Sequence, residues 1–296
     1  MRKAFIQLHI SILLAGFTGI LGKLITLNEG LLVWYRMLLT IVVMIPFSPP
    51  FRGLGGGFGG RLWGVMGVGS LLALHWVFFF GSIKASNVSI GVVCFSLTGL
   101  FTALLEPLLN RRRISGREVW LSVIPLAGIL LIFHFDVRYR MGILLGIASA
   151  LLAALFTITN KRVGKERSSA TMLFYEMIGG FLCLSLLMPF YLHYFPVETL
   201  LPGWQDFVWL LIFAVFCTVL LYLLQIEVLK SISAFTLNLS YNLEPVYSII
   251  IAMLFLGEAK ELNFSFYVGL ALIVLSVLLQ TKRMLRQNTI NPINDK

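Results

Sequence analysis

The stretch from Trp63 to Lys84, WGVMGVGSLLALHWVFFFGSIK, decides the fold because a related stretch follows it 146 positions later. Residues 209–230 are WLLIFAVFCTVLLYLLQIEVLK, so Trp76 aligns with Tyr222, and a Trp and a Lys bound both stretches without a gap. Each stretch is apolar and matches the length of about 20 residues that a helix needs to cross a membrane. The match therefore predicts a duplication of membrane helices.

Two shorter matches occur in the same order at nearly the same offset. At offset 140, residues 34–37 (WYRM) align with residues 174–177 (FYEM). At offset 138, a ladder on one helix face aligns with a second ladder: Ser11, Ala15, Gly19 and Lys23 with Ser149, Ala153, Thr157 and Lys161. Apolar helices resemble one another by composition, so each match alone is weak. Together they predict two repeats, residues 1–137 and 138–283, followed by a tail at 284–296.

The composition indicates an integral membrane protein. Of the 296 residues, 58% are hydrophobic and 12% charged, and the mean hydropathy is +0.92, which leaves too little charge to cover a soluble domain. The predicted fold class is all-α, with ten transmembrane helices as two inverted five-helix repeats. The predicted spans are 4–22, 31–48, 62–82, 87–109, 119–135, 142–160, 170–192, 207–229, 234–256 and 264–281. The short loops between them exclude a soluble catalytic domain.

The N-terminus has two interpretations. Met1, Arg2 and Lys3 precede an apolar run with small residues, as in a secretory signal peptide. The same small-residue ladder recurs in the span 142–160, inside the chain, where no signal peptide occurs. The recurrence favours a retained first helix.

The positive charge indicates a membrane orientation. With the N-terminus in the cytoplasm, 17 of the 23 Lys and Arg residues lie on the cytoplasmic side and five outside, with Arg36 inside a span. This bias orients a membrane protein, so the net charge of +10 needs no nucleic-acid partner, and both termini are expected in the cytoplasm. An odd number of helices in each repeat makes the second repeat enter the membrane from the opposite side. A site between inverted repeats can open to either side in turn, which is alternating access.

Polar residues gather near the middle of the span 234–256. Glu244 lies roughly 15 Å into the membrane at about 1.5 Å of helix rise per residue. Pro245 follows it and removes a backbone donor, while Asn238, Tyr241 and Asn242 precede it within two turns. Such polar groups at a helix break are typical of a helix that lines a cavity. The alternative is a simple proline kink in which a neighbour satisfies the carboxyl group of Glu244.

Two further charged residues lie inside predicted spans. Arg36 lies roughly 9 Å below the outer face, at a depth that would allow it to pair with Glu244 if their helices are neighbours. Glu176 is the repeat equivalent of Arg36 and lies a similar distance from the cytoplasmic face. We expect both to act as gate residues or charge partners. The alternative is that each side chain extends to the nearer membrane surface.

Aromatic residues and one histidine complete the expected cavity. We expect Trp34, Tyr35, His75 and Trp76 to line it with the polar residues of the span 234–256. A histidine can carry protons near neutral pH, although one on an apolar face more often only donates a hydrogen bond. The three cysteines lie in apolar spans without metal-ligand spacing, and no nucleophile motif occurs, so neither a metal site nor a catalytic residue is predicted.

The last two spans carry the residues of a known family pattern. Residues 243–246 (LEPV), 254–258 (LFLGE) and 269–273 (GLALI) resemble the signature of EamA-type transporters in the drug/metabolite transporter superfamily. The first-half equivalent, residues 86–113, departs from the pattern, with Gly99 in place of the proline and Arg111-Arg112 in place of Gly-Glu. The resemblance covers essentially the whole chain. It identifies a family and no substrate.

The resemblance implies a bacterial inner-membrane protein that exports amino acids or similar small metabolites through a central cavity, without ATP and without a cofactor. Small four-helix relatives couple to protons through a glutamate in their first helix, which this chain lacks there. The expected partners are a small-molecule solute and the lipid bilayer, and a homodimer is left open. Two alternatives remain, a membrane-embedded enzyme or flippase for a lipid-linked sugar, and a scaffold without transport activity.

Overall fold

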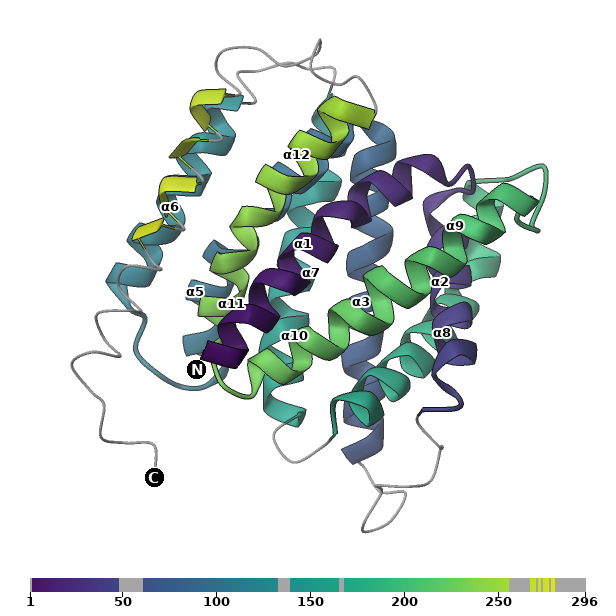
Figure 1. The fold of residues 1–296 in the computed structure, drawn as a ribbon, viewed down its shortest axis with the longest axis horizontal. Helices are drawn as coiled ribbons and strands as arrows, with labels where there is room; N and C mark the ends of the chain where they lie inside the picture. The colour runs from purple at the N-terminus through teal and green to yellow at the C-terminus, as the bar shows by residue number, and fades with distance from the viewer. Residues whose placement is uncertain are drawn as a thin grey trace.

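The structure, a computed structural model, describes residues 2–47, 61–132, 139–164 and 168–255, together with 267–269, 271–272, 274–276 and 278–279. Across these residues the regular structure is helical and contains no strand (Figure 1). The first half holds α1 (Arg2–Leu24), α2 (Glu29–Met44), α3 (Arg61–Ala85), α4 (Val88–Phe95), α5 (Thr98–Leu109) and α6 (Gly116–Ile132). The second holds α7 (Arg140–Val163), α8 (Ser169–Tyr194), α9 (Trp204–Ala214), the π-helix η2 (Val215–Leu220), α10 (Leu221–Leu229), α11 (Ala234–Ser240), the 3₁₀ turn η3 (Tyr241–Leu243) and α12 (Glu244–Phe255).

Six helical segments in the described ranges are long and apolar enough to cross a membrane. They are Lys3–Leu24, Leu62–Ala85, Val88–Leu109, Arg140–Val163, Ser169–Tyr194 and Trp204–Leu229. The predicted spans 31–48 and 119–135 correspond to the shorter helices α2 and α6, of 16 and 17 residues. Of the tenth predicted span, 264–281, residues 267–269, 271–272, 274–276 and 278–279 are described and are helical, and the others lie outside the described residues. The molecule is therefore an all-α membrane protein, and the number ten stays a prediction.

Helix starts recur at the offsets found in the sequence. Asn28 before α2 and Ser168 before α8, 140 positions apart, each accept a hydrogen bond from the backbone N–H three residues later. Asn87 before α4 and Ser233 before α11, 146 positions apart, do the same. These side chains satisfy N–H groups that a helix start leaves without a partner. The equivalent helices of the two halves thus begin at equivalent residues.

Two of the predicted spans are broken helices. The span 234–256 is interrupted by the 3₁₀ turn η3 directly before Glu244, and Pro245 then occupies the first turn of α12, where a proline is tolerated. The span 87–109 corresponds to one apolar helical segment, Val88–Leu109, which a turn divides into α4, ending at Phe95, and α5, beginning at Thr98. Thr98 and Glu244 are 146 positions apart, so both restarts occupy the same place in the repeat.

The two halves begin with helices that run in opposite directions. The Lys84 ammonium group, at the end of α3, donates to the carbonyl oxygen of Leu27, just after α1. Ser82, also at the end of α3, donates to the carbonyl of Gly142 at the start of α7, over 2.6 Å. The end of α1 and the start of α7 therefore lie on the same side of the molecule.

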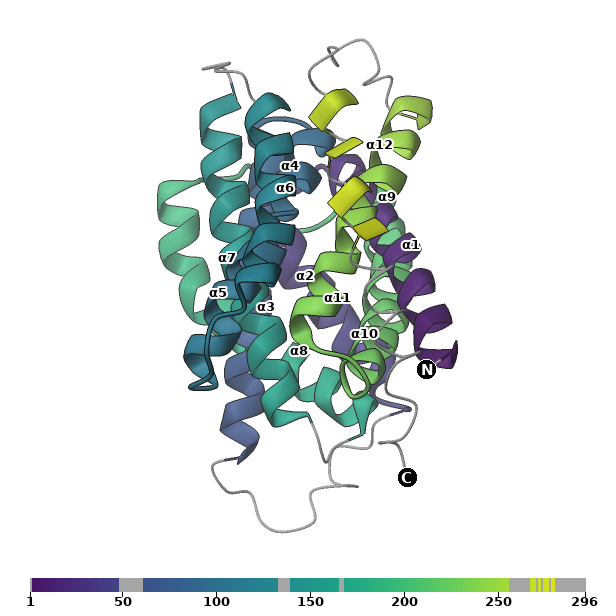
Figure 2. The same cartoon turned by 90° about the vertical axis from the view of Figure 1, so that its left-hand side faces the viewer.

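The packing places α3 near the centre, between α7 and α8 (Figures 1 and 2). α4 packs against α12, and its repeat equivalent α11 packs against α5, the equivalent of α12. At the periphery, Ser276 donates to the backbone carbonyl of Leu121 in α6 over 2.7 Å. One continuous apolar core runs through both halves.

Candidate functional site

A cavity of about 50 Å³ lies between the two halves. Sixteen residues line it, seven from the first half and nine from the second. Twelve of them form six pairs at the repeat offsets: Ala15 with Ala153, Thr18 with Phe156, His75 with Leu221, Trp76 with Tyr222, Phe79 with Gln225 and Phe95 with Tyr241. The cavity is thus surrounded by equivalent positions of both halves.

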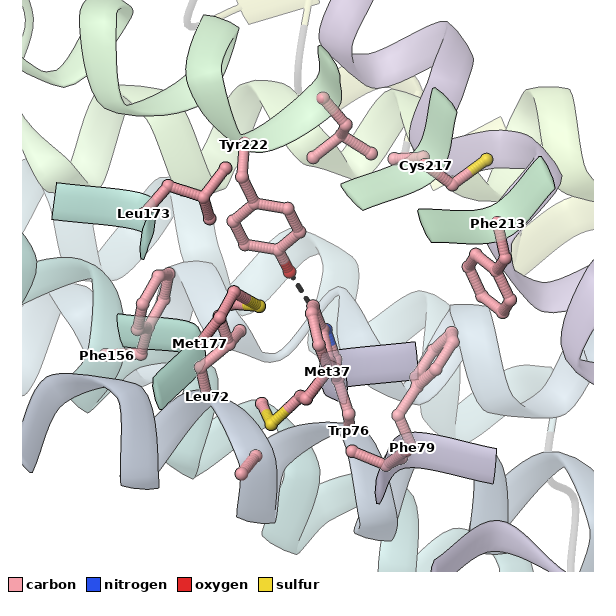
Figure 3. Packing of buried hydrophobic residues seen from close by; sticks show 14 of the residues in the cluster. Met37, Leu72, Trp76, Phe79, Phe156, Leu173, Met177, Phe213, Cys217 and Tyr222 are labelled. Carbon is pink, nitrogen blue, oxygen red and sulfur yellow. Dashed lines mark hydrogen bonds between the residues drawn. The ribbon is translucent and has the colours of Figure 1, made fainter. Parts of the chain in front are cut away.

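One of these pairs is in direct contact. The indole Nε1 of Trp76 donates to the hydroxyl of Tyr222 over 2.9 Å, and the two rings meet edge to face with centroids 5.4 Å apart. Figure 3 shows this hydrogen bond within the buried packing, between Met37 and Leu173. The cavity is thus lined by two residues, 146 positions apart, that contact each other directly.

The four remaining lining residues have no lining equivalent, and all four are polar. They are Arg36, Thr157, Asn238 and Glu244. Their equivalents, Glu176, Gly19, Val92 and Thr98, do not line the cavity. The paired positions surround the cavity from both halves, whereas these four polar residues have no equivalent in its wall.

Arg36 is the largest polar side chain that is fully buried, at 0% exposure. Its Cζ lies 3.6 Å from the centroid of the Trp76 ring and 4.0 Å from that of Phe213, so the guanidinium is held between two aromatic rings. Nε donates to the Thr218 hydroxyl over 2.7 Å, and Nη2 donates to the carbonyl of Cys217 over 2.8 Å. Nη1 is buried without a hydrogen-bond partner.

The π-helix η2 makes these two acceptors available. The Thr218 hydroxyl, which accepts from Arg36, itself donates to the carbonyl of Phe213 over 3.1 Å. The Cys217 carbonyl, in the same turn, accepts from Arg36. π-helical turns inside α-helices are frequent at functional sites. Here the turn separates α9 from α10 where α2 packs against them.

Asn238 belongs to a hydrogen-bonded group that joins three helices. Its Nδ2 donates to the Thr102 hydroxyl in α5 over 2.8 Å, and its Oδ1 accepts from the Thr157 hydroxyl in α7 over 3.2 Å. Glu244 is 4% exposed, and its carboxyl group makes no ion pair within the part of the chain that the structure describes. Gln225 also lines the cavity, with its Oε1 buried and without a partner.

His75 and Tyr241 are oriented by serines of the first helix in each half. His75 Nδ1 lies 2.8 Å from the Ser149 hydroxyl, and the imidazole stacks on Phe95 at 5.3 Å between centroids. The Tyr241 hydroxyl donates to the Ser11 hydroxyl over 3.0 Å. Ser11 and Ser149 are 138 positions apart, so both belong to the repeated ladder.

The predicted site residues thus divide into two groups. Arg36, His75, Trp76, Asn238, Tyr241 and Glu244 line the cavity, and four others do not. Trp34 donates to the Ser185 hydroxyl over 2.9 Å, and the Tyr35 hydroxyl donates to the Leu200 carbonyl over 3.1 Å. Asn242 lies in η3 with its Nδ2 buried and unpartnered, and Glu176 accepts from the Asn160 amide over 2.7 Å.

Ten of the sixteen lining residues were not predicted from the sequence. Two of them could have been found, Tyr222 as the repeat equivalent of Trp76 and Gln225 as an amide inside an apolar span. The pairing considered for Arg36 and Glu244 is not formed. Within the described ranges, Lys230 and Glu227 make a salt bridge of 2.8 Å at one end of α10. The same ranges contain no cluster of three His, Cys, Asp or Glu residues that could hold a metal ion.

Comparisons with known proteins agree with this architecture. The chain is 24% identical over 196 residues to "Uncharacterized transporter YxxF" of Bacillus subtilis (strain 168), a match that covers 66% of this chain and 62% of that protein. A solved structure titled "Crystal structure of protein" has the same fold, with a TM-score of 0.67, 20% identity, and coverage of 94% of this chain and 97% of that one. The model of the EamA-like transporter family matches residues 2–134 and 140–281. The chain therefore belongs to the EamA-like transporter family, and it is a multi-pass membrane protein.

Proposed function

We propose that this protein is a secondary transporter that exports a small organic metabolite, of the amino-acid kind, by alternating access between two inverted repeats. The observation that carries the proposal is the central cavity, which equivalent positions of both halves surround. A site at the interface of inverted repeats can face one side of the membrane and then the other as the halves rock. No ATP and no cofactor are required for such a cycle.

Three features support the division into inverted repeats at residues 1–137 and 138–283. The family model matches two separate ranges, 2–134 and 140–281. Helix starts recur at offsets 138, 140 and 146. The first helices of the halves, α1 and α7, run in opposite directions.

The orientation in the membrane is also a proposal, with both termini in the cytoplasm of a bacterial inner membrane. At the end of α7, Lys161 donates to the carbonyl of Ile232, and Arg162 donates to that of Leu109 over 2.8 Å. Lys230 and the run Arg111–Arg113 follow helices that end beside these contacts. This basic end is the cytoplasmic one under the rule that Lys and Arg are enriched in cytoplasmic loops.

The role proposed for each predicted residue follows from its position. Glu244, Asn238, Tyr241, His75 and Trp76 contact the solute in the cavity. Asn242, in the turn before Glu244, joins them when α11 and α12 move, because its amide is buried without a partner two residues before Glu244. Trp34 and Tyr35 contact the solute on its way to the outer face. Glu176 acts as a gate residue with Asn160.

The transport proposal is tested with purified protein in proteoliposomes loaded with a broad mixture of small metabolites. We expect the protein to release a subset of them, and Glu244→Gln to lower the initial rate by about tenfold, because it changes a group that faces the solute. Glu227→Gln is the matched control, since that carboxyl group lies at the surface in a salt bridge and should leave the rate unchanged.

If no solute leaves the vesicles through the wild-type protein, the transport proposal is wrong. If Glu244→Gln and Asn242→Ala both transport like the wild type, the central cavity is not the site. Topology is tested by labelling Arg112→Cys in intact cells and in inverted vesicles. Labelling only from the outside would contradict the proposed orientation.

The alternative, a flippase for a lipid-linked sugar, differs from a metabolite transporter in the route that its substrate needs. A sugar headgroup with its lipid would need a lateral opening to the bilayer. Reconstituted protein that moved a fluorescent lipid-linked sugar and no soluble metabolite would favour the flippase.

A further inference from the structure

Arg36 is a buried cation without a counter-ion. No carboxylate lies within salt-bridge distance of its guanidinium in the part of the chain that the structure describes. Its neighbours are a carbonyl, a hydroxyl and aromatic rings, which orient the group and leave its charge without a negative partner. Buried charges in proteins are normally paired, because the interior solvates an isolated charge poorly. An anion from outside the chain would supply the missing partner.

The surroundings of Arg36 leave one of its three nitrogens without a hydrogen-bond partner. Two of its three nitrogens are held by Thr218 and Cys217 of η2, and the plane is fixed between the rings of Trp76 and Phe213. The third, Nη1, has no partner although the whole side chain is buried in the cavity wall. A guanidinium that is fixed in this way loses little conformational entropy when it binds a planar anion.

The other cavity residues restrict the class of anion. Glu244 contributes a carboxyl group on the same cavity, which disfavours a doubly charged ligand such as phosphate. The Oε1 of Gln225 is a buried acceptor without a partner and would receive a hydrogen-bond donor. A singly charged carboxylate with a nearby N–H or O–H group satisfies both orphan atoms. The cavity volume of about 50 Å³ accommodates a group of this size.

We infer that Arg36 is the subsite for the carboxylate of the transported solute, and that the solute carries a hydrogen-bond donor that faces Gln225. The inference rests on the proposed transport function and deepens it by naming the charged group that is recognised. Trp76 lies over the face of the guanidinium, so the carboxylate accepts in its plane, at Nη1, and recognition takes place beside the contact between Trp76 and Tyr222 at the centre of the molecule.

The test measures thermal stabilisation of the purified full-length protein by matched probes. L-alanine, L-leucine and L-phenylalanine are compared with their C-terminal amides, and acetate and inorganic phosphate are included. We expect at least one carboxylate to raise the unfolding temperature, and its amide to need about tenfold more ligand or more for the same shift, as is typical for a lost charge-assisted hydrogen bond. Phosphate should have no effect.

Variants then assign the preference to Arg36. Arg36→Gln should abolish the preference for acid over amide, and Arg36→Lys should retain part of it. Arg162→Gln is the matched control, because Arg162 is exposed at the end of α7 and donates to the carbonyl of Leu109, outside the cavity. If Arg36→Gln does not fold, the comparison of acids with amides on the wild-type protein still decides.

Three results would overturn the inference: equal stabilisation by acids and amides, no stabilisation by any carboxylate, or a folded Arg36→Gln protein that keeps the preference. Stabilisation by phosphate as strong as by the carboxylates would also overturn it. Failure here is distinct from failure of the transport proposal. A transported solute without a carboxylate contradicts the role of Arg36 and leaves transport intact, whereas vesicles that release nothing contradict transport itself.

Discussion

Two interfaces that the repeat makes equivalent, α3 against α8 and η2 against α2, are packed in opposite ways. Between α3 and α8 the backbones touch, since a Cβ at Gly180 would lie 2.7 Å from the carbonyl oxygen of Gly69, and one at Gly69 would overlap the carbonyl of Glu176. At the equivalent positions of the second interface stand Thr40 and Val215, and no glycine. Each of these positions therefore carries the Cβ for which the contact between α3 and α8 has no room.

The difference in spacing decides where a polar group can be placed. Position 176 contributes its backbone to the close contact, and its carboxyl group points to Asn160 in α7. The equivalent position, 36, contributes its side chain, which enters the wider space between α2 and η2 and reaches the cavity. The same helices thus recur in both halves, while the side-chain volume at the equivalent interfaces decides which half supplies the charged group.

The largest effect should come from adding a side chain at Gly69, where the first interface has a bare backbone contact. Gly69→Leu would drive a side chain into the backbone of Glu176, so we expect no folded protein in detergent. At the equivalent position of the second interface, Val215→Ala only removes two methyl groups and should cost about 1 kcal/mol. Yield and monodispersity on size exclusion, followed by thermal unfolding, measure both.

Gly67→Ala is the control in the same helix, because a Cβ there meets nothing within 4 Å. A Gly69→Leu protein that is produced and unfolds like the wild type would show that the α3–α8 contact is not close in the membrane. The contrast between the two interfaces would then be lost.

The next effect concerns Asn238, whose repeat equivalent is Val92. Asn238→Val makes the two halves alike at this position and removes hydrogen bonds to Thr102 and Thr157. Both threonines also donate to carbonyls of their own helices, so we expect a loss of stability of about 1–2 kcal/mol and a folded protein. Transport in proteoliposomes should fall by about tenfold, since the solute loses a polar contact.

Val92→Thr is the reverse change, at a fully buried position outside the cavity, and should lower stability with little effect on the rate. If Asn238→Val transports at the wild-type rate, the polar side chain at position 238 does not contact the solute. Asn238 would then be a structural link between α5, α7 and α11.

The sequence predicted six of the cavity residues, and it showed the offsets at which helix starts recur, because both signals are local. Offsets of 138, 140 and 146 are visible as aligned residues, and Asn238 or Glu244 stand out as polar groups in apolar spans. The rotation of a helix about its own axis leaves no such signal. Depth alone put Trp34 and Tyr35 beside Arg36, whereas their hydrogen bonds go to Ser185 and Leu200.

Backbone irregularities were predictable only where proline marks them. Pro245 indicated the break before α12, but the break after Phe95 has no proline, and there the Ser96 hydroxyl is buried without a hydrogen-bond partner. The π-helix η2 likewise has no proline, although it supplies both acceptors of Arg36. Its position follows from tertiary contact between α2 and α9, which a local pattern does not contain.

The smallest effect should appear where the halves are most alike, at the hydrogen bond between Trp76 and Tyr222. A double-mutant cycle with Trp76→Phe and Tyr222→Phe isolates this bond, and we expect a coupling of about 0.5–1.5 kcal/mol in thermal or denaturant unfolding. We also expect coupling in the transport rate, because both rings line the cavity and separate as the halves move.

A second bond between the halves sharpens this expectation. Tyr191 in α8 donates to Glu29 in α2 over 2.7 Å, away from the cavity. A cycle with Tyr191→Phe and Glu29→Gln should give a similar coupling in stability and none in transport rate, because this bond joins equivalent helices without touching the solute. Equal transport coupling in both cycles would mean that any bond between the halves limits the rate. If neither cycle shows coupling in the transport rate, the contact that moves during transport lies elsewhere. The contact between Trp76 and Tyr222 would then stay fixed while other parts of the cavity wall move.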